Sequence, residues 1–281
     1  MPIAKSFAGL SFDRPRLMGI VNVTPDSFSD GGFFYDFDEA IAHGLALVAA
    51  GADVLDVGGE STRPGADPVS IAEELRRVLP VIEGLAAAGV SQISIDTRNA
   101  AVMRAAVQAG ATIINDVSAL CYDPASLGTA CELAVPVILM HAKGPPQNMQ
   151  DDPVYDDVVK EVLNFLVRRS ADLEQAGIPV GDIAIDPGIG FGKTLEHNLA
   201  LLNAMNAFVE TGRVVLLGAS RKRFVAALDN GVPAHRRLGG SLAAVAAAYH
   251  GGCRFFRVHD VAETHQHLKI LHAIETVQTS Q

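Results

Sequence analysis

The chain alternates between short runs of apolar residues and longer stretches in which apolar and polar residues mix. The short runs are too brief for helices and are bounded by turn residues, so they predict buried parallel strands. These predicted strands occupy residues 17–21, 54–57, 93–96, 113–116, 136–140, 183–186, 214–218 and 255–259. The stretches between them predict helices at residues 38–50, 71–88, 99–108, 124–133, 154–176, 195–210, 236–249 and 261–277.

Alternation of eight strands with eight helices is typical of a (β/α)8 barrel, the TIM barrel of the α/β class. A doubly wound open sheet is the alternative, but it does not require this number of repeats. No linker or low-complexity segment interrupts the 281 residues, so we predict a single domain over residues 1–281. Residues 3–12 precede the first strand, and we expect them to close the bottom of the barrel.

Local signals at the helix ends add three expectations. Ser70-x-x-Glu73 matches a capping box, and Asp260-x-x-Glu263 resembles one with aspartate as the cap. Pro80 lies inside the second predicted helix and should kink it, because proline has no amide hydrogen to donate.

Composition and charge exclude some classes of protein. The net charge of −10 and the pI near 5.3 disfavour a nucleic-acid partner. The longest apolar stretch, residues 242–248, is too short to span a bilayer, and residues 1–17 lack the pattern of a signal peptide. We therefore expect a cytoplasmic protein with no membrane partner. The three cysteines (Cys121, Cys131 and Cys253) have no metal-like spacing and are expected to be small buried hydrophobic residues in a reducing compartment.

Polar and ionisable side chains follow each predicted strand. In a barrel these positions meet at one mouth, where barrel enzymes carry their active sites. The carboxylates and amides suit a flat heterocycle with several N–H groups, such as a 2-amino-4-oxo pterin or guanine, and the cations suit phosphate oxygens. The residues are Asn22, Asp56, Asp96, Asn115, Asp116, His141, Asp186, Ser220, Arg221, Lys222, Arg257 and His259.

Two loops after the first two strands are rich in glycine, proline and small hydroxyl residues. Residues 22–32 and 58–65 are therefore candidate mobile lids at the mouth. Residues 186–193 superficially resemble a phosphate-binding loop, but Pro187 stands where a P-loop requires glycine, so the match fails.

These motifs resemble those of the dihydropteroate synthases. Residues 18–32 and 58–65 are similar to the two long signature stretches of that family, which makes chance agreement remote. Shorter segments resemble the remaining family motifs in the same order along nearly the whole chain. They are residues 94–97, 114–118, 139–141, 186–193, 220–222 and 257–261.

The resemblance implies an activity and a set of site residues. Members of the family join a pterin diphosphate to p-aminobenzoate in folate synthesis, with Mg2+, and many are homodimers. The implied pterin-binding residues are Asp96, Asn115, Met140, Asp186, Phe191, Gly218, Lys222 and Arg257. The implied diphosphate-binding residues are Asn22, Arg63, Arg257 and His259, with Mg2+ held near Asn22. The implied p-aminobenzoate and loop positions are Phe28, Thr62, Arg63, Pro64 and Ser220.

The family mechanism assigns catalytic roles to Asp96, Arg63, Lys222, Arg257 and His259. Departure of diphosphate leaves a cationic pterin, which the arylamine attacks. Asp96 would stabilise that cation, while Mg2+ and the basic residues stabilise the leaving diphosphate. The two loops would exclude water, which otherwise traps the cation. Sulfonamides, which mimic p-aminobenzoate, are expected to inhibit such an enzyme.

The chain departs from the family pattern at a few positions beside the implied pocket. Residues 141–144 read His-Ala-Lys-Gly where His-Met-Gln-Gly is usual, and Ala119 and Ala226 stand at common glycine positions. These changes bear on fine specificity more than on the reaction. We interpret His141 as a hydrogen-bonded core residue, and Asp56 as a residue that orients loops or Arg63.

Two other functions compete with this interpretation. A pterin-dependent methyltransferase domain would share the barrel and the pterin pocket, but it would not need Arg63, His259 or the long first loop. A non-catalytic paralogue that acts as a binding protein should have lost loop or anion-site residues, and here they are all present. Diphosphate release from the two substrates and Mg2+ distinguishes these alternatives.

Overall fold

The computed structural model describes residues 5–24, 37–61, 68–144, 149–151 and 153–277. Within them, eight parallel strands form a closed barrel in the order β10-β3-β4-β5-β6-β7-β8-β9. The barrel strands are β3 (Arg16–Asn22), β4 (Val54–Gly58), β5 (Ile93–Asp96), β6 (Ile113–Asp116), β7 (Val137–Met140), β8 (Ile183–Asp186), β9 (Val214–Leu217) and β10 (Phe255–Val258). Pairing of β10 with both β9 and β3 closes the ring, and the predicted (β/α)8 barrel is confirmed.

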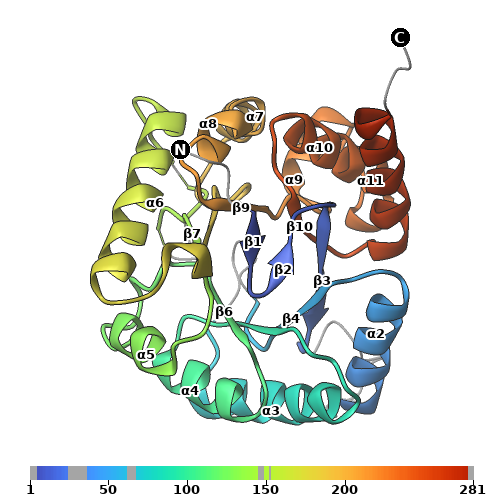
Figure 1. Ribbon diagram of the computed structural model, residues 1–281. Coiled ribbons are helices and arrows are strands. Elements are labelled where there is room, and N and C mark those ends of the chain that lie inside the picture. Colours follow the sequence, from blue (N-terminus) through green and yellow to red (C-terminus); the bar gives the residue numbers. More distant parts are fainter. Residues whose placement is uncertain (1–4, 25–36, 62–67, 145–148, 152, 278–281) are drawn as a thin grey trace.

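Helices surround the barrel as a ring, which Figure 1 shows in a view along the barrel. They are α2 (Phe37–Ala49), α3 (Ile71–Ala87), α4 (Ala100–Gln108), α5 (Ser126–Leu133), α6 (Val158–Gln175), α7 (Leu195–Asn203), α8 (Met205–Val209), α9 (Arg223–Leu228), α10 (Leu238–His250) and α11 (Val261–Thr276). Two 3-10 turns, η1 (Val180–Asp182) and η2 (Ala234–Arg236), complete the elements. None of the helices in the described ranges is both long and apolar enough to cross a membrane.

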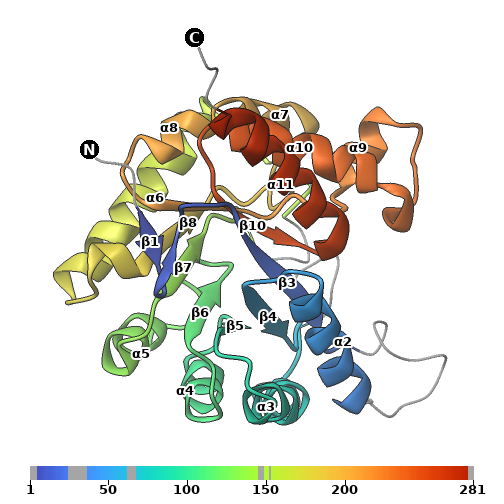
Figure 2. The same cartoon turned by 45° about the vertical axis from the view of Figure 1, so that its right-hand side comes forward.

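Three helices differ from the sequence prediction. The predicted helix 195–210 is divided into α7 and α8 at Ala204, whose backbone leaves the helical region with a ψ of 20°. The predicted helix 154–176 begins only at Val158, because the Asp157 side chain accepts a hydrogen bond from the Lys160 amide and caps the helix there. The sequence did not predict the short helix α9, because six residues are too few to show a helical periodicity. Figure 2 shows α9 projecting from the ring of helices.

The interior of the barrel has two layers, because alternate residues of each strand point inward. The lower layer, here called the apolar plug, is a cluster of buried residues: Phe7, Met18, Val54, Ile113, Ile138, Ala184, Val214, Leu216 and Phe255. Two residues further along four of these strands stand Asp56, Asn115, Asp186 and Arg257. Together with Asp96 at the end of β5, we call these residues the polar floor.

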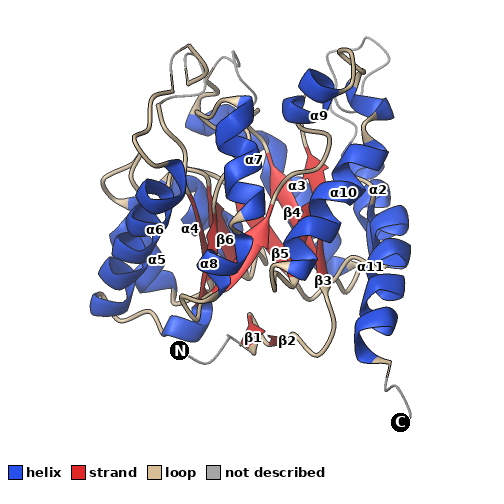
Figure 3. Ribbon diagram, turned by 90° about the horizontal axis from the view of Figure 1, so that it is seen from above, coloured by secondary structure: helices blue, strands red, loops and turns tan. Residues whose placement is uncertain are grey.

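A small hairpin closes the lower end of the barrel, as the sequence predicted for residues 3–12. Strands β1 (Ser6–Phe7) and β2 (Leu10–Ser11) pair antiparallel, and Phe7 enters the apolar plug with 1% of its surface exposed. The Phe7 and Phe255 rings lie 6.0 Å apart between centroids. In the side view of Figure 3 the hairpin lies at one end of the barrel and α9 at the other. The plug therefore leaves the opposite end as the mouth.

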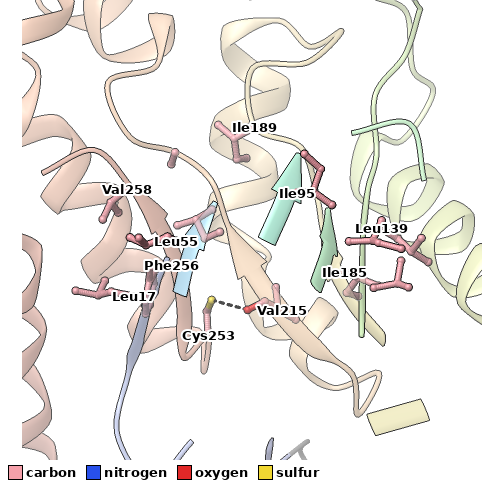
Figure 4. Packing of buried hydrophobic residues seen from close by; sticks show 14 of the residues in the cluster. Leu17, Leu55, Ile95, Leu139, Ile185, Ile189, Val215, Cys253, Phe256 and Val258 are labelled. Atoms are coloured by element: carbon pink, nitrogen blue, oxygen red, sulfur yellow. Dashed lines mark hydrogen bonds between the residues drawn. The ribbon is translucent and has the colours of Figure 1, made fainter. Parts of the chain in front are cut away.

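A second hydrophobic layer packs the outer faces of the strands against the helices. Figure 4 shows part of this layer, including Leu55, Ile95 and Phe256. Cys253 is buried within it and donates a hydrogen bond from Sγ to the Val215 carbonyl over 3.2 Å. The expectation that all three cysteines are buried is confirmed for Cys253 alone, because Cys121 is exposed and Cys131 is half-buried; all three are free thiols.

The cap predictions have mixed outcomes. Ser70 caps α3 by accepting from the Glu73 amide, as predicted, but the Glu73 carboxylate binds Arg76 and Arg77 instead of completing the box. The predicted capping box at Asp260 is wrong, since its side chain makes no cap bond and forms an ion pair with Arg221. Helix α3 continues through Pro80, and the kink expected at this residue stays a prediction.

Candidate active site

A cavity of about 600 Å3 opens at the mouth of the barrel, at the C-terminal ends of the strands. Its lining includes predicted site residues from the ends of β3, β5, β9 and β10 and from the loops that follow β8 and β9. They are Asn22, Asp96, Phe191, Gly218, Ser220, Lys222, Arg257 and His259. Asn115, Met140 and Asp186 also lie at strand ends but are almost fully buried. The structure thus brings these predicted residues to one end of the barrel.

The Arg257 guanidinium lies at the centre of the polar floor between two carboxylates. Its Nε donates to Asp56 Oδ2 over 2.6 Å, and its second terminal nitrogen donates to Asp96 Oδ2 over 2.8 Å. Asn115 Nδ2 donates to the same Asp56 oxygen over 3.1 Å. The expectation that Asp56 orients Arg63 falls outside the described residues, and the contacts of Asp56 are instead with Arg257 and Asn115.

Burial shifts the pKa values of two floor carboxylates, Asp96 and Asp186. Loss of hydration raises the pKa of Asp96 to about 7; Arg257 opposes this shift, and the negative charge of Asp56 adds to it. Burial also raises the pKa of Asp186, against the hydrogen bond that its carboxylate accepts from the Gly188 amide over 2.7 Å. A floor with such carboxylates can accept hydrogen bonds from ring N–H groups and can stabilise a positive charge held above it.

The buried side chain of Lys193 holds the loop after β8, and this residue was not among the predicted site residues. Lys193 Nζ contacts His141 Nδ1 at 3.0 Å and donates to the Phe191 carbonyl at 3.0 Å. Burial lowers the pKa of Lys193 to about 7 and, together with the Lys193 charge, the pKa of His141 to about 3. His141 is therefore neutral and its ring packs edge-on against Phe165, as expected for a core residue.

The same loop approaches the site closely because it contains glycines. A Cβ atom at Gly188 would lie 1.9 Å from the His141 carbonyl oxygen, and the φ of this residue is +67°. On the loop, the Phe191 ring lies 3.8 Å below Lys222 Nζ, a cation–π contact at the cavity wall. Gly218 faces Asp186, whose Oδ2 would be 3.2 Å from a Cβ at that position. Side chains at Gly188 and Gly218 would collide with the His141 carbonyl and crowd the Asp186 carboxylate.

Ser220 holds the His259 ring in place. The His259 backbone amide donates to Ser220 Oγ over 3.2 Å, and the same Oγ lies 3.0 Å from His259 Nδ1. A hydroxyl group has one hydrogen to donate and two lone pairs that accept, so Ser220 Oγ can bond the amide and Nδ1 together and hold the ring in either neutral tautomer. Burial and the charge of Arg257 lower the pKa of His259 to about 3, so the ring is neutral.

Several predicted residues fall outside the described part of the chain. Phe28, Thr62, Arg63 and Pro64 are among them, so their placement stays a prediction. Of the departures from the family pattern, Ala119 adopts a left-handed φ of 54° where glycine is usual. Lys143 donates to the Val154 carbonyl and lies over the Tyr155 ring, beside the loop after β8.

The mouth offers oxygen ligands that fit Mg2+. Asn22 ends β3 and lines the cavity, and its amide oxygen is the type of ligand that this hard cation prefers. Within the described ranges no group of three or more His, Cys, Asp or Glu side chains could hold a metal ion. A single amide ligand fits an ion that is otherwise coordinated by substrate phosphates and water.

The sequence and the fold are similar to those of characterised enzymes. Residues 18–259 match the model of a family described as pterin binding enzymes. The dihydropteroate synthase of Escherichia coli K12 is 45% identical over 264 residues, which are 94% of this chain and 93% of that protein. The structure of the Xanthomonas albilineans dihydropteroate synthase with 4-aminobenzoic acid superposes with a TM-score of 0.90 at 50% identity, covering 96% of each chain.

Two further structures extend the comparison. The same X. albilineans enzyme in complex with 7,8-dihydropteroate gives a TM-score of 0.87 at 48% identity, covering 96% of this chain and 97% of that one. The Yersinia pestis dihydropteroate synthase with a sulfonamide drug complex gives 0.90 at 44% identity, covering 96% and 98%. Taken with the cavity and its polar floor, these similarities show that the chain belongs to the pterin-binding enzyme family and, within it, to the dihydropteroate synthases.

Proposed function

We propose that the chain condenses 6-hydroxymethyl-7,8-dihydropterin diphosphate with p-aminobenzoate, giving 7,8-dihydropteroate and diphosphate in folate synthesis. The observation that carries this proposal is the polar floor below a cavity of about 600 Å3 that basic side chains line. The cavity is large enough for a bicyclic ring and an aryl ring together. The floor matches the donor pattern of a pterin, and the basic residues match two anionic groups.

The pterin ring binds between the floor and the loop after β8. Asp96, Asn115 and Asp186 accept hydrogen bonds from its N–H groups, because carboxylate and amide oxygens are the acceptors available there. Met140 and Phe191 supply apolar contacts, and the absence of a side chain at Gly218 leaves room for the ring. Lys222 adds a donor, and the flat Arg257 guanidinium stacks on the ring face.

The diphosphate lies at the side of the mouth formed by Asn22, Arg257 and His259. Neutral His259 contributes a ring N–H group, and Arg257 and Arg63 contribute positive charge. Asn22 would hold a Mg2+ ion, and the ion when bound would supply charge neutralisation for the leaving diphosphate. The p-aminobenzoate occupies the outer part of the cavity, near Ser220 and the loop residues Phe28, Thr62, Arg63 and Pro64.

In this reaction the protein itself forms no covalent bond with either substrate. The bond between C9 of the pterin and the diphosphate oxygen breaks, and its electron pair leaves with the diphosphate. The arylamine nitrogen forms a new bond to C9 with its lone pair and then loses a proton. Asp96 stabilises the positive charge on the ring during this step, because a carboxylate in a buried site acts strongly on a nearby cation. The loops exclude water, which would give the alcohol instead.

The test is a turnover assay with both substrates and Mg2+. We expect diphosphate and 7,8-dihydropteroate to form in equal amounts, measured by coupled phosphate detection and chromatography. Competition by a sulfonamide against p-aminobenzoate is the control for the aryl site. Folded protein that releases no diphosphate would favour a binding paralogue, and binding of a methylated pterin without diphosphate release would favour a methyltransferase.

We further propose a homodimer that acts in the cytoplasm. The three free thiols are compatible with a reducing compartment. Outer helices such as α10 supply the interface. Sedimentation equilibrium is the measurement, and a monomer at micromolar concentration would contradict the dimer.

A further inference from the structure

Asp56 is a fully buried carboxylate for which the reaction described above has no use. It lies in the middle of β4 with 0% of its surface exposed and is not among the residues that line the cavity. Its Oδ2 nonetheless accepts the two hydrogen bonds from Arg257 and Asn115, at 2.6 and 3.1 Å. Asp56 therefore contacts two residues that would touch the pterin without reaching the pterin itself.

The contact with Asp56 decides which atom Asn115 presents to a ligand. An amide oxygen at 3.1 Å from a carboxylate oxygen would be repelled, so the Asn115 amino group must be the partner. The Asn115 carbonyl oxygen is then directed away from Asp56. Since an oxygen only accepts hydrogen bonds, Asn115 can select a ring that donates an N–H at that position.

The contact with Asp56 also fixes the plane of Arg257. One edge of the guanidinium is held through Nε by Asp56, and its second terminal nitrogen is held by Asp96. Two anchors on separate strands leave a planar group little freedom to rotate. The guanidinium face is thus oriented before any ligand arrives.

Stability alone does not account for a carboxylate at this position. Oδ1 of Asp56 is buried and has no hydrogen-bond partner among the described residues. A buried charged oxygen without a partner costs free energy of folding, so a residue selected only for stability would be neutral. The charge is explained by what Oδ2 does for Arg257 and Asn115.

We propose that Asp56 is a positioning residue that sets the orientation of Arg257 and Asn115 for pterin recognition. This inference rests on the proposed function, because it takes a pterin as the ligand. It assigns Asp56 no contact with substrate and no proton transfer. Its effect on binding passes entirely through the two side chains it holds.

The test is the affinity of the Asp56→Asn variant for the pterin diphosphate without p-aminobenzoate, measured by calorimetry. Loss of the charge removes the ionic anchor of Arg257, and we expect the Kd to rise about 10- to 100-fold, the range seen when partners that orient ligating side chains are removed. The matched control is Ser94→Ala. Ser94 is paired with Asp56 in the β4–β5 register and is equally buried, but it makes no hydrogen bond to the floor.

A double-mutant cycle separates positioning from a general structural defect. In an Arg257→Gln background the same Asp56→Asn change should raise the Kd by less than about 3-fold, because Arg257 is already gone and an amide oxygen at position 56 can still accept from Asn115 Nδ2. Equal losses in both backgrounds, or an unchanged Kd in the single variant, would overturn the inference. If Asp56→Asn does not fold, Asp56→Ser, which is smaller, takes its place in the same cycle. The binding readout needs no turnover, so an inactive wild-type protein would count against the proposed function alone.

Discussion

At the scale of single residues, the site depends on ionisable side chains whose pKa values burial has shifted from their ordinary values. Asp96, Lys193, His141 and His259 all have pKa values displaced by loss of hydration. Sequence could predict which residues gather at the mouth, since each follows a strand. It could not predict that Asp56 and Arg257, 201 residues apart, would share a hydrogen bond, because pairing inside a barrel depends on side-chain directions.

The raised pKa of Asp96 gives a prediction for the pH dependence of the reaction. The carboxylate is neutral below its pKa of about 7, and only the anion stabilises a cationic ring, so kcat/KM for the pterin diphosphate should fall as the pH decreases through about 7. In Asp56→Asn the neighbouring negative charge is gone, the pKa of Asp96 decreases, and the acid limb moves to lower pH. Steady-state kinetics between pH 5 and 9 measures both profiles. Substrate ionisation is common to the two enzymes, so coincident acid limbs would refute the role of Asp56 in this shift.

At the scale of secondary-structure elements, a helix-capping signal in the sequence was reliable where no other group bonded to the capping side chain. Ser70 caps α3, as its pattern predicted. Asp260 does not cap α11, because its side chain forms an ion pair with Arg221 instead. An ion pair with an arginine outweighs a single cap bond, and the sequence does not reveal that Arg221 lies nearby. The strands were placed to within about two residues of their ends, as is usual for boundaries read from a pattern.

The end of α5 offers a prediction of stability. Ala134 closes this helix in the left-handed conformation, with φ 52° and ψ 38°, where glycine is normally favoured. Ala134→Gly relieves the clash of the Cβ atom, and the free energy of unfolding should increase by about 0.5–1 kcal/mol, after the entropy cost of glycine is included. Chemical denaturation measures it. Gly substitution at Ala176, a C-cap with ordinary φ of −80°, should instead destabilise the protein.

At the scale of the whole molecule, the barrel separates stability from chemistry. The apolar plug and the hairpin occupy the lower end, and the polar floor and cavity occupy the mouth. The fold could be predicted from sequence because its signal is repeated eight times, so errors at single elements did not matter. The arrangement of side chains at the site could not be predicted from sequence. It depends on single contacts that do not repeat along the chain, such as that between Lys193 and His141.

This separation predicts that damage to the plug spares the reaction. Phe7→Ala removes a ring that is 1% exposed and should lower the free energy of unfolding by about 3–5 kcal/mol. We expect kcat/KM to stay within 2-fold of wild type at a temperature where the variant is folded, on the order of experimental error. Val180→Ala, at a residue 56% exposed, is the control for an ordinary surface change. A large loss of kcat/KM in folded Phe7→Ala protein would show that the two ends are coupled.

On four strands the polar floor lies two residues beyond the apolar plug. This spacing also limits which changes of sequence the protein can tolerate. Insertion or deletion of a single residue within β4 would rotate every later side chain of that strand to the opposite face. Val57 would then enter the barrel, and Asp56 would be pressed among the apolar side chains under the helices. Evolution of these strands can therefore proceed by substitution, whereas changes in length are confined to the loops at either end.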